Sequence, residues 1–384
     1  MWKIVFPGIA MIAIVYAFAR FSFGLFLPDI SESLALSESQ AGIVGSAAYV
    51  AYTAALCSAY LFIQTFTARR MVLLAGATAF LGMIGIAFST GFYILMISVF
   101  AAGLGSGWAS PAFSQVISQS LTSDQQNKGN TWINTGTSFG LMVTGAIVLL
   151  FTDQWRWSYL LFAVITMIVW WWNAAALENN KKKISALDQK RAWPEMLKKG
   201  RFLIAASLGV GFSSSIYWTF SRSYVAAIHE FTMNQSIIFW IVMGAAGIIG
   251  GTAGGIIQKT GLSFAYRGGV FVTAVSIICL TIPIQPAVYL SALLFGISYI
   301  FMTGLFIVWA TRVFPDSPSL GVSLSFLALG IGQALGSGAG GMVIEEISYP
   351  FAFITFSFLG LFFIVCRVEE RKIDTKGLNE QRFV

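Results

Sequence analysis

Twelve apolar stretches, each long enough to cross a lipid bilayer, limit what this 384-residue chain can fold into. A helix rises about 1.5 Å per residue and a hydrocarbon core is about 30 Å thick, so about 20 apolar residues span it. Only 10% of the residues are charged, against about 25% in soluble domains. The sequence therefore predicts an all-α membrane protein with twelve transmembrane helices at about 4–27, 40–64, 71–89, 92–120, 129–151, 157–176, 202–226, 236–257, 267–284, 287–311, 320–343 and 349–366.

One long polar segment divides these helices into six and six. It is basic and contains Lys181, Lys182 and Lys183. We therefore predict two six-helix bundles, residues 1–176 and 202–368, joined by a loop of residues 177–201 and followed by a tail of residues 369–384.

The distribution of lysine and arginine predicts the orientation. If the N-terminus is cytoplasmic, 20 of the 23 Lys and Arg residues fall on the cytoplasmic side and only Arg156 falls outside. Cytoplasmic loops carry such an excess of positive charge. We expect both termini in the cytoplasm of a bacterial-type plasma membrane. The same bias explains the basic pI of about 9.3 without a nucleic-acid partner.

The two remaining cations, Arg20 and Arg222, lie inside predicted spans. Arg20 precedes Pro28 by about 12 Å of helix. All 16 Asp and Glu residues fall in predicted loops or at span ends, so we expect no carboxylate beside either arginine. An arginine binds a carboxylate or phosphate through two parallel hydrogen bonds, and the missing charge then belongs to an anionic substrate. Backbone carbonyls, tyrosines or water are the alternative partners.

Further polar residues inside the spans are candidates to line a substrate cavity, since polar groups in lipid are costly unless they turn inward. Ala13, Ala17 and Gly24 share the helical face of Arg20 and are expected to leave room around its guanidinium. The substrate-binding candidates besides the two arginines are Tyr16, Tyr52, Gln115, Asn134, Tyr217, Tyr299 and Gln333.

Coupling to protons has few candidates. Asp29, His229 and Glu230 are possible proton relays at the outer ends of spans, although a solvated loop histidine is the simpler interpretation of His229. The cysteines show no metal-ligand spacing and the chain carries no catalytic motif. We expect no enzyme, metal or cofactor.

Two turns lie at a constant offset. Leu61–Arg70 and Gly254–Ser263 are 193 positions apart, which suggests duplicated halves. The chain resembles the major facilitator superfamily in its twelve spans and in the turn Gly254–Gly261 (GGIIQKTG) between two helices of the second half. Gln258 and Thr65 stand where the family has an acid.

The first helix resembles a narrower group. Arg20-x-x-Phe23-x-Leu25-x-x-Pro28 is similar to the opening helix of organophosphate/phosphate antiporters and neighbouring anion carriers. In those carriers, arginines on the first and seventh helices bind the anion. The resemblance implies this role for Arg20 and Arg222. Fewer residues separate Arg222 from the turn after its helix than separate Arg20 from the turn after the first helix. Arg222 is therefore expected to lie a helical turn or more closer to the outside than Arg20.

These observations favour a secondary transporter that moves a small organic anion, such as a carboxylate, by alternating access. Its partners would be the substrate, membrane lipid and a co-transported proton or exchanged anion. Efflux of a drug or amphiphile is the alternative, and a non-transporting membrane sensor or membrane enzyme is a more remote one.

Overall fold

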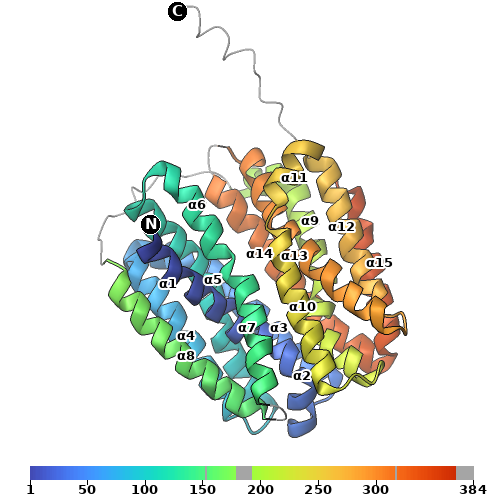
Figure 1. Cartoon of the computed structure of the whole chain (residues 1–384). Coiled ribbons are helices and arrows are strands. Elements are labelled where there is room, and N and C mark those ends of the chain that lie inside the picture. The colour runs from blue at the N-terminus through green and yellow to red at the C-terminus, as the bar shows by residue number, and fades with distance from the viewer. Residues whose placement is uncertain (152–153, 179–192, 316–317, 369–384) are drawn as a thin grey trace, which may run out of the picture.

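The computed structural model describes residues 1–151, 154–178, 193–315 and 318–368, and the regular structure in these ranges is helical (Figure 1). Lys181–Lys183 of the central loop and the 369–384 tail lie outside the described residues. The helices are α1 (Trp2–Ile12), π-helix η1 (Ala13–Phe21), α2 (Ser22–Leu34), α3 (Glu38–Thr65), α4 (Ala68–Ala87), α5 (Phe92–Ser120), α6 (Ser123–Asn134), α7 (Gly136–Leu150), α8 (Trp155–Ala176), α9 (Trp193–Ala227), α10 (Met233–Gly250), α11 (Ala253–Thr260), α12 (Leu262–Cys279), α13 (Gln285–Val313), α14 (Pro318–Glu346), α15 (Tyr349–Phe362) and the short 3₁₀ helix η2 (Phe363–Val365).

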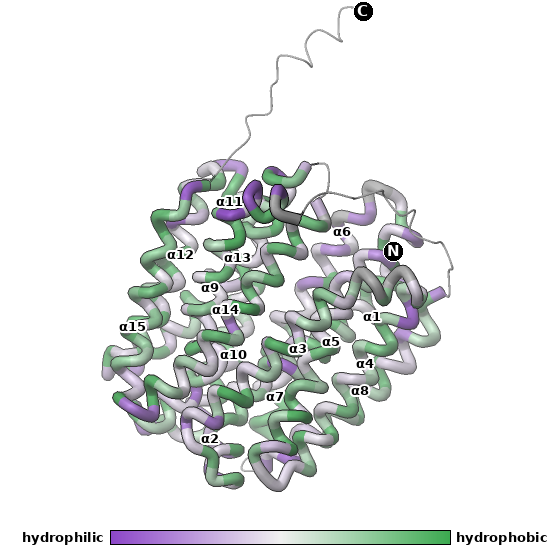
Figure 2. The backbone as a smooth tube through the Cα atoms, turned by 180° about the vertical axis from the view of Figure 1, so that it is seen from behind, coloured by the Kyte–Doolittle hydropathy of each residue, from purple (hydrophilic) through white to green (hydrophobic). Residues whose placement is uncertain are grey.

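These helices reproduce the predicted spans. Eleven helical stretches of the described chain are long and apolar enough to cross a membrane, and the shorter apolar stretch Tyr349–Val365 supplies the twelfth. Four of the predicted spans contain more than one element: α1–η1–α2, α6–α7, α10–α11 and α15–η2. Figure 2 shows hydrophobic residues along the helices and hydrophilic segments mainly at their ends. The predicted all-α, twelve-helix fold class is confirmed.

The helices pack as two groups. In the first, α4 packs on α5 and α8, and α3 packs on α5; in the second, α13 packs on α10 and α12, and α9 packs on α14 and α15. The groups meet where α3 contacts α14, α7 contacts α10 and α2 contacts α9. We call α1–α8 the first bundle and α9–α15 the second bundle. Their exact boundaries stay a prediction.

The contacts between the bundles lie toward one end of the molecule. We call the end nearer to the N-terminus and α11 the terminal side, and the opposite end, where α2 lies, the far side (Figure 1). Ser46 Oγ in α3 donates to the carbonyl oxygen of Ala334 in α14 at 2.6 Å, and Ser337 Oγ donates to that of Gly42 at 3.0 Å. Both contacts fall in the far-side half of their helices.

The first span is longer than predicted. Its helix continues through Pro28 and ends at Leu34, where Ala35 adopts a left-handed conformation with φ of 50°. The predicted end of this span at residue 27 was therefore too early, and Asp29 lies on a helix. This continuation points Asp29 toward the second bundle, with the consequence described below.

Candidate functional site

Arg20 lies near the end of η1 and is buried, with only 5% of its surface exposed. A π-helix adds a residue to the helical turn, and such segments often occur at functional sites. Arg20 Nη2 donates to Oε1 of Gln333, from α14, at 2.6 Å. The predicted cation on the first helix therefore meets the predicted amide on the eleventh span.

Aromatic rings surround the guanidinium of Arg20. Its Cζ lies 4.0 Å from the ring centre of Tyr52, 4.9 Å from Tyr49, 5.1 Å from Phe21 and 5.9 Å from Tyr16. Ring faces attract a cation, by about 2 kcal/mol or more where water is excluded. The rings thus stabilise the charge without neutralising it.

A hydrogen-bonded chain leads from Arg20 into the second bundle. Gln333 is fully buried, and its Nε2 donates to Tyr299 Oη, from α13, at 3.0 Å. Four predicted site residues, Arg20, Tyr52, Tyr299 and Gln333, therefore lie together. Tyr16, the fifth, is half-buried at the edge of this group, where its hydroxyl is 3.1 Å from Ser110 Oγ.

Arg20 is incompletely satisfied. Its Nε is buried without a hydrogen-bond partner, and no ion pair involves Arg20 within the part of the chain that the structure describes. A cavity of about 10 Å³ adjoins Arg20, lined also by Tyr49, Trp218 and Thr219. That volume holds about one water molecule, so a substrate needs further space to enter here.

Arg222 has a different environment. It is 2% exposed on α9 and pairs with the carboxylate of Asp29, and the same nitrogen donates to the carbonyl oxygen of Leu25. Its Nε donates to Ser236 Oγ at 3.2 Å. The expectation that no carboxylate lies beside either arginine was wrong for Arg222, because the longer first helix carries Asp29 to it. The pair joins the first bundle to the second.

Two more contacts close the far side around this pair. Tyr349 Oη donates to Glu38 Oε1 at 2.6 Å, and the backbone N–H of Ser39 donates to Glu345 Oε2 at 2.7 Å. The first contact joins the start of α3 to α15, and the second joins it to α14. We refer to these contacts and the Asp29–Arg222 pair as the far-side latch.

The other predicted substrate-binding residues lie elsewhere. Tyr217 is fully buried inside the second bundle, with its hydroxyl 2.8 Å from Ser291 Oγ and its ring stacked on Phe295 at 3.8 Å. Gln115 is half-buried on α5, and Asn134 is exposed at the end of α6. The contacts described for Arg20 include none of these three.

The predicted proton relays are also separated. Asp29 is paired with Arg222, whereas His229 Nε2 lies 2.7 Å from the carbonyl oxygen of Leu280. Glu230 is exposed and has a φ of 53° at the end of α9. Asp29 is thus the member of this set that takes part in a contact between the bundles.

The small residues beside Arg20 serve helix packing. A Cβ atom at Gly24 would overlap the carbonyl oxygen of Trp218, so glycine lets α2 approach α9 closely. A Cβ atom at Gly140 would lie 2.7 Å from the Cβ of Ala17 and 2.9 Å from the Cα of Ala13. Ala13, Ala17 and Gly24 therefore allow close helix packing, and Gly24 also lines the small cavity beside Arg20.

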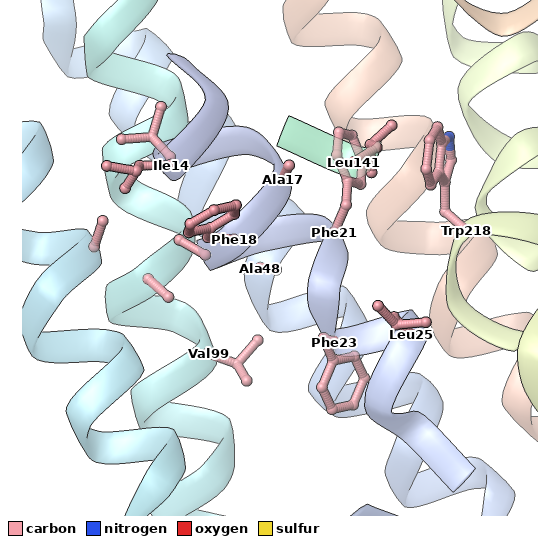
Figure 3. Close-up of a cluster of buried hydrophobic side chains, with 14 of the residues drawn as sticks. Ile14, Ala17, Phe18, Phe21, Phe23, Leu25, Ala48, Val99, Leu141 and Trp218 are labelled. Carbon is pink, nitrogen blue, oxygen red and sulfur yellow. The ribbon is translucent and has the colours of Figure 1, made fainter. Parts of the chain in front are cut away.

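Two aromatic residues of the site were missed from sequence. Phe21 stacks on Trp218 of α9 with ring centres 4.2 Å apart, and both lie in the buried cluster of Figure 3. Trp218 also meets the ring of Tyr299 edge-on at 5.0 Å. Phe21 could be found as the neighbour of Arg20, but no sequence signal pairs it with Trp218.

A family model described as Major Facilitator Superfamily matches residues 9–319. The chain belongs to this superfamily. Its members are transporters of small molecules, so this protein is a multi-pass membrane transporter. A search of curated proteins found no match.

Solved structures of other transporters share the fold. A D-xylose–proton symporter is 15% identical with a TM-score of 0.78, and the match covers 97% of this chain and 98% of that one. The inward-open xylose transporter XylE from E. coli is 12% identical, with 99% of each chain covered and a TM-score of 0.77. The nucleoside transporter NupG is 11% identical, with 94% and 96% covered and a TM-score of 0.74. At these identities the likeness shows the fold alone.

Proposed function

We propose that this superfamily member carries a small organic anion, such as a carboxylate, across a bacterial-type plasma membrane by alternating access, with Arg20 as the anion-binding cation. The observation that carries this proposal is the state of Arg20. It is a buried cation whose described partners are a neutral amide and aromatic rings, and its Nε is buried without a partner.

The comparison of the two arginines supports this choice. A buried charge is costly unless it is paired. Arg222 has its carboxylate in Asp29, so its charge is already balanced, whereas that of Arg20 is not. We therefore assign substrate binding to Arg20 and assign Arg222 to the far-side latch. Tyr16, Tyr52, Tyr299 and Gln333 complete the site.

The arrangement of the bundles supports alternating access. The cross-bundle contacts described above lie on the far side, which we take as the outside, while both termini are cytoplasmic. The described state is then closed to the outside. Opening to the outside requires the Asp29–Arg222 pair to separate, because its partners belong to different bundles.

A co-transported proton or an exchanged anion drives the cycle in this proposal. Asp29 is the candidate proton carrier, because it pairs with a buried arginine at the contact between the bundles and its side chain is 22% exposed. His229 and Glu230 are the secondary candidates. Exchange of one anion for another needs no titrating carboxylate.

One observation favours the alternative of amphiphile or drug efflux. The rings of Phe21, Tyr49, Tyr52 and Trp218 form much of the wall around Arg20 and fit the apolar body of such a compound. In that case the cation–π contacts alone satisfy Arg20, and a neutral compound binds as well as an anion.

A thermal-shift screen of the purified full-length protein separates these functions. Mono- and dicarboxylates, phosphate, organic cations and neutral amphiphiles are compared on the wild type, Arg20→Lys, Arg20→Gln and the control Arg201→Gln. Arg201 is exposed at the terminal end of α9, so its replacement removes the same charge away from the site. A ligand that binds the folded state raises its apparent stability.

We expect one class of carboxylate to stabilise the wild type and Arg201→Gln. Arg20→Lys keeps the charge but loses the fork, and its affinity should fall about tenfold or more. Uptake of the same anion into proteoliposomes then separates a transporter from a sensor. Stabilisation by neutral amphiphiles alone, retained in Arg20→Gln, would overturn the anion proposal.

A further inference from the structure

We propose that Gln333 occupies the anion-binding edge of Arg20 in the empty carrier, and that the substrate displaces it. The inference rests on the proposed function and concerns how the same site responds to its ligand. It makes Gln333 a competitor of the substrate for Arg20, where the sequence had suggested a direct ligand.

The geometry at the guanidinium carries this inference. Nε and Nη2 are the two nitrogens on one edge of an arginine, and their N–H bonds run parallel, which matches the two oxygens of a carboxylate. Gln333 Oε1 accepts a hydrogen bond from Arg20 Nη2 at 2.6 Å, while the neighbouring Nε of Arg20 is buried and has no partner. Of the two nitrogens of this edge, Nη2 is therefore engaged by Gln333 and Nε has no partner.

Gln333 does not satisfy Nε in this arrangement, because its oxygen accepts from Nη2 alone. Its amide has a single acceptor oxygen, and its Nε2 donates to Tyr299 at 3.0 Å. A carboxylate brings two oxygens and a negative charge, so it can satisfy both nitrogens of Arg20 with charge-assisted bonds. Such bonds are roughly twice as strong as neutral ones. A neutral ligand offers only neutral hydrogen bonds in place of that of the amide, so the exchange favours an anion.

Displacement also changes the contact between the bundles. Arg20 belongs to the first bundle and Gln333 to α14 of the second, so their hydrogen bond crosses the interface. Ser46 donates to the carbonyl oxygen of Ala334, the next residue of α14. When the anion binds Arg20, the hydrogen bond between Arg20 and Gln333 is lost next to this contact. Binding of the anion is thereby linked to the α3–α14 interface.

Two substitutions of Gln333 test the exchange with opposite expected signs. Gln333→Leu keeps the approximate size but removes the competing oxygen, and we expect the anion that stabilises the wild type to bind about tenfold more tightly. Gln333→Glu supplies a carboxylate inside the protein. We expect a raised melting temperature without ligand and loss of the anion response.

The matched control is Gln125→Glu, which makes the same chemical change at an exposed position of α6. It should leave both the melting temperature and anion affinity unchanged. Anion dissociation constants come from titrated thermal shifts and calorimetry on the full-length protein, and size-exclusion chromatography checks folding of each variant.

Weaker anion binding in Gln333→Leu, or a retained anion response in Gln333→Glu, overturns the inference and leaves the proposed function standing, because the wild type still responds. No anion response in the wild type overturns the proposed function itself. The two failures are therefore distinguishable within one set of measurements.

Discussion

Asp29→Asn should open the far side of the carrier. The substitution removes the negative charge from the pair with Arg222 while keeping the size of the side chain. Arg222 is 2% exposed and the pair bridges α2 of the first bundle and α9 of the second. Its loss therefore acts mainly on the equilibrium between the closed and open far side.

The size of the effect follows from the remaining contacts. Removing one partner of a buried ion pair costs about 3–5 kcal/mol when the other charge is left alone. Here Arg222 keeps the carbonyl oxygen of Leu25 and the hydroxyl of Ser236, and the new amide still offers an acceptor. The loss is then the difference between a charge-assisted and a neutral hydrogen bond, about 1–1.5 kcal/mol. This corresponds to about a tenfold shift toward the open far side.

Cysteine labelling measures this shift. Ser46→Cys places a thiol where α3 meets α14, in a background whose native cysteines, Cys57, Cys279 and Cys366, have been replaced. A membrane-impermeant maleimide added from the far side reacts when the bundles separate there. Where opening and closing are fast, the labelling rate follows the open population. Asp29→Asn should raise this rate about tenfold.

Two comparisons decide the interpretation. Glu32→Gln makes the same acid-to-amide change on an exposed position of α2 and should label like the parent. Arg222→Gln combined with Asp29→Asn should label no faster than Arg222→Gln alone, because the pair is then already broken. Equal labelling rates for Asp29→Asn, Glu32→Gln and the parent would refute the latch.

Three further results are expected. Gly24→Ala should lower the free energy of unfolding by about 1–3 kcal/mol, seen as a lower melting temperature, because the new methyl group overlaps the carbonyl oxygen of Trp218. The control Gly254→Ala should not lower it, because a Cβ atom there meets nothing within 4 Å. Tyr52→Leu should destabilise the ligand-free protein by about 1–2 kcal/mol in calorimetry, since the ring lies 4.0 Å from the Cζ of Arg20. Tyr52→Phe keeps the ring face and should lose less stability than Tyr52→Leu; an equal loss in both Tyr52 variants would contradict a cation–π role.

Much of the architecture could be predicted from sequence, because the bilayer imposes a fixed length on every crossing segment. The position of Arg20 in an uncharged helix and the amide of Gln333 in another were both visible as polar groups without a reason to face lipid. The general rule that such groups turn inward predicts that both face the interior of the protein. The structure places them in direct contact at 2.6 Å.

The partners within the site were harder to predict, because they depend on how far helices extend and how closely they pack. Asp29 was expected at the outer end of its span, which was predicted to end at about residue 27, yet the helix continues to Leu34. Gly24 looked like space for the guanidinium, but a glycine shows only that something is close, and here that neighbour is the backbone of α9. The π-helical turn at Arg20 leaves no recognisable pattern in sequence.

The spacing of the far-side pair has a consequence for the origin of the carrier. Asp29 and Arg222 are 193 positions apart, the same offset that separates the turns Leu61–Arg70 and Gly254–Ser263. By this offset they stand at corresponding positions of the two halves, and the structure brings their side chains together. Two identical copies of one six-helix unit would have placed like charges together there. Under the duplication that the offset suggests, this contact is a position at which the two copies had to differ before they could hold each other closed.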